Sequence, residues 1–229
     1  MKRPPDEPCK RLYTLGKRLE QSDRRRTAIF SAAEEMLESE GYLNLTMDSV
    51  ARRSGVSRQT VHNLFRTKSG LLEALFDHLA LRGGMERMGE VMQFIFTETD
   101  PVAMLRAFVH IFTGFWSNDR LLIRHIHGIA TLDPLFGKAV EARNQRRRGS
   151  AAKVIDHIAR LSNLADKSQN PRMAAGLYAM TSFEFFDVLV EATGSQEEAA
   201  DQLTAHVQAL IAQWLQTVSA TPSPAHHKR

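Results

Sequence analysis

Hydrophobic residues recur at three- and four-residue spacing along most of this chain, a period that predicts helices. No segment alternates polar and apolar residues with the period of two that a half-buried strand requires. A first helix is expected to begin near Asp23, with Ile29, Ala32 and Leu37 on one face and Gly41 just past its end. The pattern therefore predicts an all-α protein.

Shorter helices follow the first. The second is expected to begin at Thr46, whose side chain can cap it, and the third to run from Ser57 to about Phe65. The fourth starts after Thr67, another candidate cap, and continues to Gly83. Longer helical patterns then cover 85–97, 101–117, 119–130, 135–162, 171–193 and 196–218.

These patterns divide the chain into a small N-terminal helical unit and a larger C-terminal helical bundle. Prolines near both ends predict irregular termini. The expected parts are a basic, flexible arm over 1–22, a three-helix domain over 23–82, a bundle over 83–219 and a disordered tail over 220–229.

Composition narrows the class of protein. The 229 residues are 43% hydrophobic, which is enough to bury one or two cores. A single cysteine, Cys9, excludes an intrachain disulfide and metal sites of the CxxC kind. No stretch approaches the roughly 20 apolar residues of a membrane span, and the charged N-terminus lacks the pattern of a secretory signal. We expect a cytoplasmic protein with no membrane partner, no metal and no cofactor.

The excess positive charge lies in the first third of the chain. Residues 1–82 contain 15 Lys and Arg against 11 Asp and Glu, a net charge of +4, whereas residues 83–229 contain 15 against 15. Two interpretations remain open: a polyanionic partner for the first third, or surplus charge that only keeps the protein in solution.

Residues 47–65, MDSVARRSGVSRQTVHNLF, have the pattern of two short helices joined by a glycine turn. Gly55 stands at the turn, where the left-handed backbone conformation is easily reached by glycine. Val50 and Ala51 are expected to face the core from the first helix, and Val61 from the second. This spacing predicts a helix-turn-helix.

The outward positions of the second helix of this motif are all polar and none is acidic: Arg58, Gln59, Thr60, His62 and Asn63. A short, polar and basic helix suits the major groove of DNA. The alternative is a small helical bundle with a glycine turn and no DNA ligand.

An ordered set of motifs runs from Arg26 to about Leu79: Ile29-x-x-Ala32-Ala33, Gly41, Thr46-Met47, Val50-Ala51, Ser54-Gly55-Val56-Ser57, Thr60-Val61, Phe65, Lys68 and Leu71-Leu72. In these motifs the chain resembles the N-terminal domain of the TetR family of one-component transcription regulators. The resemblance implies a homodimer that binds double-stranded DNA at a palindromic operator, with a C-terminal bundle that dimerises and binds a small-molecule effector.

Three positions depart from the family pattern. The family often has an aromatic residue where His62 stands and Tyr or His where Leu64 stands, so phosphate contacts carried over to these positions are the least secure. Gly70 stands where an acidic residue often completes a capping box with Thr67, which predicts a softer start of the fourth helix.

The residues expected to contact DNA fall into two classes. Arg58 is the leading base reader, because arginine can pair bidentately with guanine. Gln59 either pairs with adenine or lies against the groove, and Thr60 touches a thymine methyl or a phosphate. The residues assigned to the phosphate backbone are Thr46, Ser57, His62, Asn63 and Lys68.

Other basic residues leave two interpretations open. Arg52 and Arg53 either help to bind DNA or are solvated surface residues. The arm either enters the flanking minor groove or is a solvated tail. Its basic residues are Lys2, Arg3, Lys10, Arg11, Lys17 and Arg18, followed by Arg24 to Arg26.

The last helix has an apolar stripe at helical spacing. With the preceding apolar helix around Leu177 to Val190, it is expected to form a four-helix dimer interface; the alternative is that both faces belong to the subunit core. The stripe residues assigned to the interface are Leu203, Val207, Leu210, Ile211 and Trp214.

Methionine and aromatic residues gather in the bundle, where they form either a core or an adaptable apolar pocket. Glu184 and Asp187 would favour a cationic ligand if they faced inward; otherwise they are solvated or paired with arginine. The run Arg146-Arg147-Arg148 is expected to be a solvated helical face. The pocket residues proposed are Met88, Met92, Phe108, Phe112, Trp116, Met180 and Phe183.

No GxSxG, HExxH, glycine-rich phosphate loop or Cys–His pair is present, so we expect no enzyme and no catalytic residue. The favoured interpretation is a homodimeric repressor that a small, largely apolar ligand releases from its operator. The alternative is a DNA-binding structural or partner-recruiting protein without a small-molecule effector.

Overall fold

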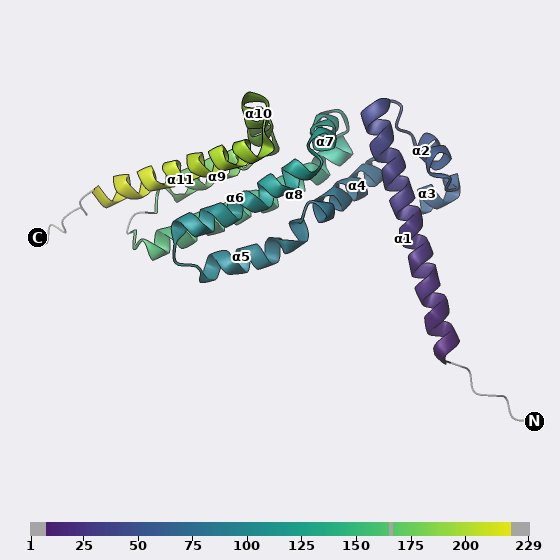
Figure 1. The fold of residues 1–229 in the computed structure, drawn as a ribbon, viewed down its shortest axis with the longest axis horizontal. Helices are drawn as coiled ribbons and strands as arrows, with labels where there is room; N and C mark the ends of the chain where they lie inside the picture. Colours follow the sequence, from purple (N-terminus) through teal and green to yellow (C-terminus); the bar gives the residue numbers. More distant parts are fainter. Residues whose placement is uncertain (1–7, 165–166, 221–229) are drawn as a thin grey trace, which may run out of the picture. The chain divides into compact units, whose positions relative to one another are not determined.

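The computed structural model describes residues 8–164 and 167–220, and its secondary structure within these ranges is helical (Figure 1). This confirms the all-α fold. The expected contents of residues 1–7 and 221–229, the start of the arm and most of the tail, lie outside the described residues.

The smaller of two compact units comprises residues 1–75. Its described helices are α1 (Pro8–Ser39), α2 (Met47–Ser54), α3 (Arg58–Phe65) and the first part of α4 (Lys68–Arg82). Ile29, Ala32 and Leu37, the apolar residues expected on one face of the first helix, are buried in this unit.

The first helix begins earlier than its sequence suggested. The chain is helical from Pro8, not from Asp23, so an irregular arm over 1–22 is wrong for residues 8–22. Proline is well tolerated at the first helical position, and the lysine, arginine, leucine and glutamate residues that follow favour a helix.

The larger unit comprises residues 76–229. Its helices begin with the end of α4 and the short 3₁₀ helix η1 (Met85–Arg87). They continue with α5 (Met88–Thr97), α6 (Pro101–Asn118), α7 (Arg120–Leu132), α8 (Pro134–Leu161), α9 (Asn170–Met180), α10 (Phe183–Thr193) and α11 (Gln196–Ala220).

The division between the units falls inside α4, between Leu75 and Phe76, and not at residue 82 as the helix pattern suggested. The reason is that Phe76 already packs with aromatic residues of the larger unit. Its ring centroid lies 5.9 Å from that of Phe115 and 6.5 Å from that of Phe136.

The helical pattern expected over 171–193 is broken into α9 and α10. Ser182 has an extended backbone, and its hydroxyl accepts a hydrogen bond from the Phe185 amide at 3.2 Å. Serine is a strong N-cap, so it starts a new helix within an otherwise continuous apolar pattern.

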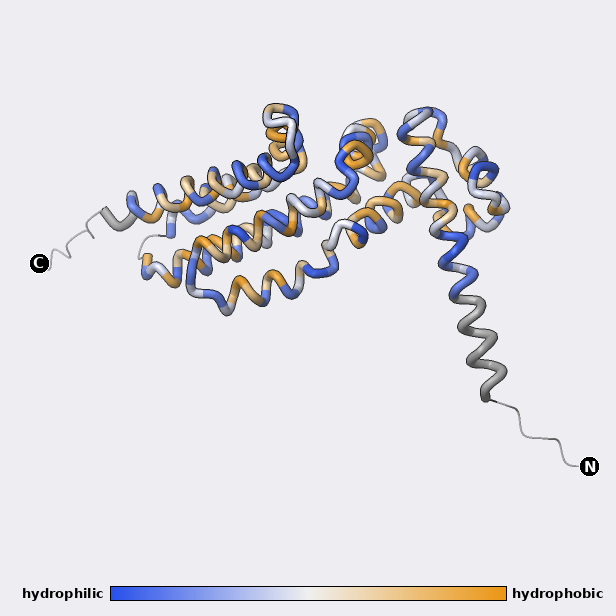
Figure 2. The backbone as a smooth tube through the Cα atoms, viewed as in Figure 1, coloured by the Kyte–Doolittle hydropathy of each residue, from blue (hydrophilic) through white to orange (hydrophobic). Residues whose placement is uncertain are grey.

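Apolar and polar residues interleave along the helices (Figure 2). Helix α6 is central to the larger unit, as expected, with Met104, Phe108, Val109 and Phe112 buried.

In the described part of the chain no single helix is long and apolar enough to cross a membrane; only α9 and α10 together, bent by 52°, reach that length and composition.

Candidate functional site

Two caps and a glycine turn build the predicted helix-turn-helix. The Thr46 hydroxyl accepts a hydrogen bond from the Ser49 amide at 3.0 Å, and the Ser49 hydroxyl accepts one from the Thr46 amide at 2.8 Å. Gly55 closes α2 with a left-handed φ of 68°, and Ser57 caps α3 by accepting from the Thr60 amide at 3.2 Å. The caps and turn predicted at these positions are confirmed.

Apolar residues of α2 and α3 hold the motif to its core. Val50 and Val61 are fully buried, and Ala51 and Phe65 are nearly so. The Phe65 ring also packs against Phe30 of α1, with 5.6 Å between the centroids. Because this side of α3 is committed to the core, its other side faces outward.

The outward side of α3 is polar. Arg58, Gln59, His62 and Asn63 are exposed, and Thr60 is half-buried. The Gln59 amide nitrogen donates to the Asn63 side-chain oxygen at 2.8 Å. These hydrogen-bonding groups are arranged one helical turn apart, which suits contacts with base edges and phosphates.

Arg58, the leading candidate for reading a base, forms an ion pair within this motif. Arg58 Nε lies 2.7 Å from Asp48 Oδ1 in α2, and both side chains are largely exposed. An exposed ion pair is weak, about 0–1 kcal/mol, so a guanine or phosphate can compete with Asp48 for the guanidinium.

Two other basic side chains have partners that the sequence did not indicate. Lys68 Nζ donates to the Tyr42 carbonyl at 2.6 Å and lies 3.5 Å from the centroid of the Tyr42 ring. Arg53 pairs with Glu35, at 2.9 Å, and with Glu40. Arg53 is therefore ion-paired within its own unit.

The junction of α3 and α4 is tight. Arg66 ends α3 with a φ of 63°, a conformation that non-glycine residues rarely adopt. A Cβ atom on Gly70 would lie 2.3 Å from the Phe65 carbonyl oxygen. The first turn of α4 therefore approaches the end of α3 so closely that glycine fits at position 70, where the family often has an acidic residue. The Thr67 hydroxyl still caps α4, because it accepts a hydrogen bond from the Gly70 amide at 3.0 Å.

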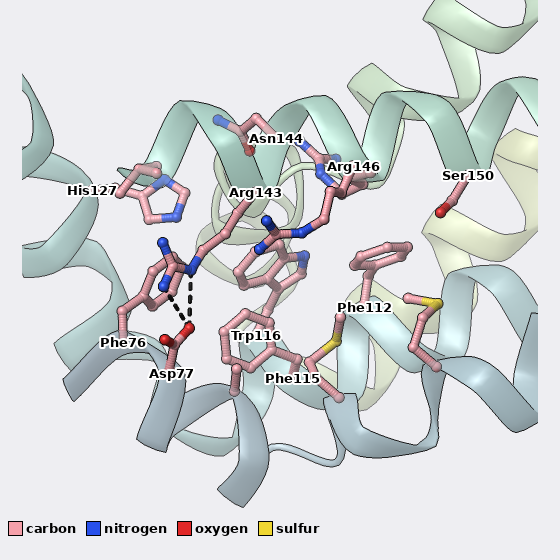
Figure 3. A pocket seen from close by; sticks show the side chains of 15 residues that line it. Phe76, Asp77, Phe112, Phe115, Trp116, His127, Arg143, Asn144, Arg146 and Ser150 are labelled. Atoms are coloured by element: carbon pink, nitrogen blue, oxygen red, sulfur yellow. Dashed lines mark hydrogen bonds and ion pairs between the residues drawn. The ribbon is translucent and has the colours of Figure 1, made fainter. Parts of the chain in front are cut away.

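A second candidate site is a cavity of about 380 Å³ within the larger unit. That volume is in the range of small-molecule sites. Figure 3 shows aromatic side chains of α6, among them Phe112 and Trp116, facing polar side chains of α8, among them Arg143, Asn144 and Arg146. Phe76, Asp77 and His127 also line it.

The structure places three of the seven predicted pocket residues on this cavity: Met88, Phe112 and Trp116. The other four, Met92, Phe108, Met180 and Phe183, do not line it. Phe108 is fully buried in the core, and Phe183 packs behind the lining, 5.7 Å from Trp116 and 4.9 Å from His127 by centroid. Helical spacing shows which residues are buried, but not which of them border a void.

The arginine run of α8 is not a solvated face throughout. Arg146 and Arg148 are exposed, as expected, but Arg147 is buried at 9% exposure and lines the cavity. Successive helix positions point about 100° apart, so the middle residue of such a run can face inward. Arg143 and His127 also line the cavity and were not among the predicted pocket residues, because spacing along a helix does not show which polar positions border a void.

Acidic residues of α10 pair with basic residues of α7. Asp187 Oδ1 lies 2.6 Å from Arg120 Nε, and Asp187 Oδ2 accepts from Arg124 Nε at 2.9 Å. Glu184 Oε1 lies 2.8 Å from His127 Nδ1, and this hydrogen bond lowers the pKa of Glu184 to about 2. Pairing with arginine is thus confirmed for Asp187, whereas the partner of Glu184 is His127.

The stripe assigned to a dimer interface belongs mainly to the subunit core. Leu203, Val207, Ile211 and Trp214 are at most 3% exposed in the single chain, and Leu210 is half-buried. An assignment of these four to a contact between subunits is wrong, because α11 packs this face on α6 and α10. An apolar stripe on a helix does not indicate which neighbour covers it.

Residues 29–75 match the family of bacterial regulatory proteins named tetR. Over 92 residues the chain is 30% identical to the HTH-type transcriptional regulator EthR of Mycolicibacterium smegmatis, a match covering 39% of this chain and 40% of EthR. It is 26% identical over 163 residues to the nucleoid occlusion factor SlmA of a Marinomonas species, covering 69% and 76%.

Solved structures share the fold. A TetR transcription regulator from Haloarcula marismortui has a TM-score of 0.62 at 18% identity, covering 81% of this chain and 95% of that one. NalD of Pseudomonas aeruginosa, the secondary repressor of the MexAB-OprM multidrug efflux pump, has a TM-score of 0.62 at 17% identity, covering 82% and 96%.

Proposed function

The chain belongs to the TetR family of DNA-binding transcriptional regulators, and we propose that it acts as a homodimeric repressor released from its operator by a small, largely apolar molecule. The observation that carries the DNA-binding part is the exposed polar side of α3, held outward by a buried opposite side. Such a helix enters the major groove in helix-turn-helix proteins.

At the DNA, Arg58 reads a base once it leaves Asp48, and Gln59 and Thr60 contact neighbouring base edges. The phosphate contacts come from the caps Thr46 and Ser57 and from His62, Asn63 and Lys68. All eight residues belong to one compact unit, so they bind as a single module.

A homodimer follows from the family's use of two half-sites on a palindromic operator. The contact between subunits involves faces other than the buried stripe of α11. We assign Val188 on α10, which is 64% exposed, to that contact.

Release by a small molecule is supported by the cavity in the larger unit, whose volume and aromatic lining suit a drug-sized ligand. A ligand weakens operator binding only if its affinity differs between the DNA-bound and the free state. A ligand-free architectural protein would instead have a filled core, and the cavity favours the regulator.

The test is selection of genomic fragments by the purified protein, followed by sequencing. We expect an enriched palindrome with half-sites about one helical turn apart, and repression of a reporter placed behind it. Enrichment without a palindrome would contradict the dimeric operator complex, and activation of the reporter would contradict repression.

A further inference from the structure

The cavity of the larger unit contains a buried charge. Arg147 of α8 lines the cavity and is 9% exposed. Its Nη1 donates to the Tyr178 carbonyl at 2.7 Å and to the Thr181 hydroxyl at 3.4 Å, and its guanidinium lies 4.0 Å from the Tyr178 ring centroid. These contacts orient the guanidinium but bring it no negative charge.

No carboxylate among the described residues forms an ion pair with Arg147. Burial accordingly lowers the pKa of the Arg147 guanidinium. Buried charges in proteins are ordinarily paired, because an unpaired charge keeps the full cost of desolvation. The Glu184 carboxylate acts on Arg147 electrostatically, but it is hydrogen-bonded to His127 and forms no ion pair with the guanidinium. An anion bound in the cavity can form that pair.

The acids nearest to the cavity are already occupied. Asp77 lies 3.1 Å from Arg143 Nε, and Glu184 accepts from His127. The charged lining residues are Arg143, Arg146 and Arg147 against Asp77 alone, three positive charges against one negative. A net charge of +2 in a partly enclosed space favours an anionic ligand and disfavours a cationic one.

The rest of the lining suits a flat apolar body. Phe112, Phe115 and Trp116 lie on the side of the cavity opposite α8 (Figure 3). A further polar contact is available at His127, whose Nε2 is buried and has no hydrogen-bond partner among the described residues. An acceptor can bind there if the imidazole is protonated, and a donor if it is neutral.

We propose that this cavity binds a small aromatic carboxylic acid, with its carboxylate on Arg147 and its ring against Phe112 and Trp116. The proposal rests on the ligand-responsive function proposed above and names the class of ligand. A planar guanidinium pairs with a carboxylate through two parallel hydrogen bonds, which gives the acid an advantage over neutral molecules of the same shape.

The test compares three probes of one shape: 2-naphthoate, 2-naphthamide and 2-naphthylmethylamine, titrated calorimetrically into the full-length protein. We expect the acid to bind at least about tenfold more tightly than the amide, and the amine to bind most weakly. Equal binding of acid and amide, tighter binding of the amine, or no binding of the acid at 5 mM would each overturn the proposal.

Two variants locate the carboxylate. Arg147→Met should abolish the preference for acid over amide, whereas Lys138→Gln, which removes an exposed positive charge of α8 that does not line the cavity, should preserve it within about threefold. An unchanged preference in Arg147→Met would overturn the assignment. If Arg147→Met does not fold, the series of three probes on the native protein decides.

Failure of this inference is distinguishable from failure of the proposed function. If the acid binds but leaves the operator complex intact, release by the ligand is contradicted and the ligand class stands. If a neutral or cationic aromatic releases the operator while the acid does not bind, the ligand class is contradicted and the regulatory function stands.

Discussion

Arg58 of α3 lies 2.7 Å from the carboxylate of Asp48 in α2, so the base-reading candidate is paired with an acid in the free protein. DNA binding must exchange this pair for a base or a phosphate. Because both groups are largely exposed, the exchange costs at most about 1 kcal/mol.

Replacing Arg58 by alanine should reduce affinity for the selected operator by about 1–3 kcal/mol and relax specificity at one base pair. A guanine contact that is lost affects only the sequences that contain it. The measurement is fluorescence anisotropy on the operator and on single-base variants. Uniform weakening across all variants would show that Arg58 contacts only phosphate.

Replacing Asp48 by asparagine should strengthen binding by up to about fivefold, because it frees Arg58 and removes one negative charge close to DNA. The measurement is again fluorescence anisotropy on the operator, with Asp48→Asn tested alone and in the Arg58→Ala background. The gain should shrink there, since the guanidinium that Asp48 restrains is absent. A full gain in both backgrounds would assign the effect to general charge repulsion.

Lys68 is expected to contact phosphate, so Lys68→Ala should weaken all sequences alike and lower the slope of log K against log salt by about one. Tyr42 provides the control, because it holds the ammonium by its ring and its carbonyl. Tyr42→Leu should weaken binding less and preserve the slope. An unchanged slope in Lys68→Ala would remove Lys68 from the phosphate contacts.

Gly70→Ala should lower the free energy of unfolding by about 1–3 kcal/mol, because the added Cβ would lie 2.3 Å from the Phe65 carbonyl oxygen. The matched control is Gly128→Ala in α7, where a Cβ would meet nothing within 4 Å. There alanine should stabilise the helix by about 0.5–1 kcal/mol. Urea denaturation of both variants is the measurement, and equal stabilisation by both would contradict the tight α3–α4 junction.

Glu184→Gln should destabilise the protein at pH 7 but not at pH 2. The folded protein lowers the pKa of Glu184 from 4.5 to about 2, so the stabilising contribution is present above pH 4.5 and is lost as pH falls to about 2. The difference should stay below about 1 kcal/mol, because the side chain is 67% exposed. Glu197→Gln, at another exposed position, is the control; a pH-independent difference for Glu184→Gln would contradict the His127 contact.

Val188→Glu should shift the protein toward monomers in analytical ultracentrifugation, because it places a charge on the exposed apolar residue of α10. Val102→Glu, at a position on α6 that is 43% exposed, should leave the sedimentation coefficient unchanged. A dimer that persists in Val188→Glu would move the proposed contact away from this position.

Short-range features of the DNA-binding motif could be predicted from sequence. The caps Thr46 and Ser57 and the turn at Gly55 depend on residues within four positions along the chain, and all three occur where expected. The pairing of Lys68 with Tyr42 could not be predicted. The partners are 26 residues apart, and only the folded unit brings them together.

The sequence by itself determined that this protein is helical, where most of its helices begin and end, and which side of α3 stays polar. Tertiary structure alone decided what covers each apolar stripe and where a cavity remains. The α11 stripe became core, and Arg147, one of three consecutive arginines, became a buried charge. The physical reason is the sequence separation of the interacting residues. Hydrogen bonds and caps within a helix join residues close in sequence, whereas burial depends on packing between helices distant in sequence.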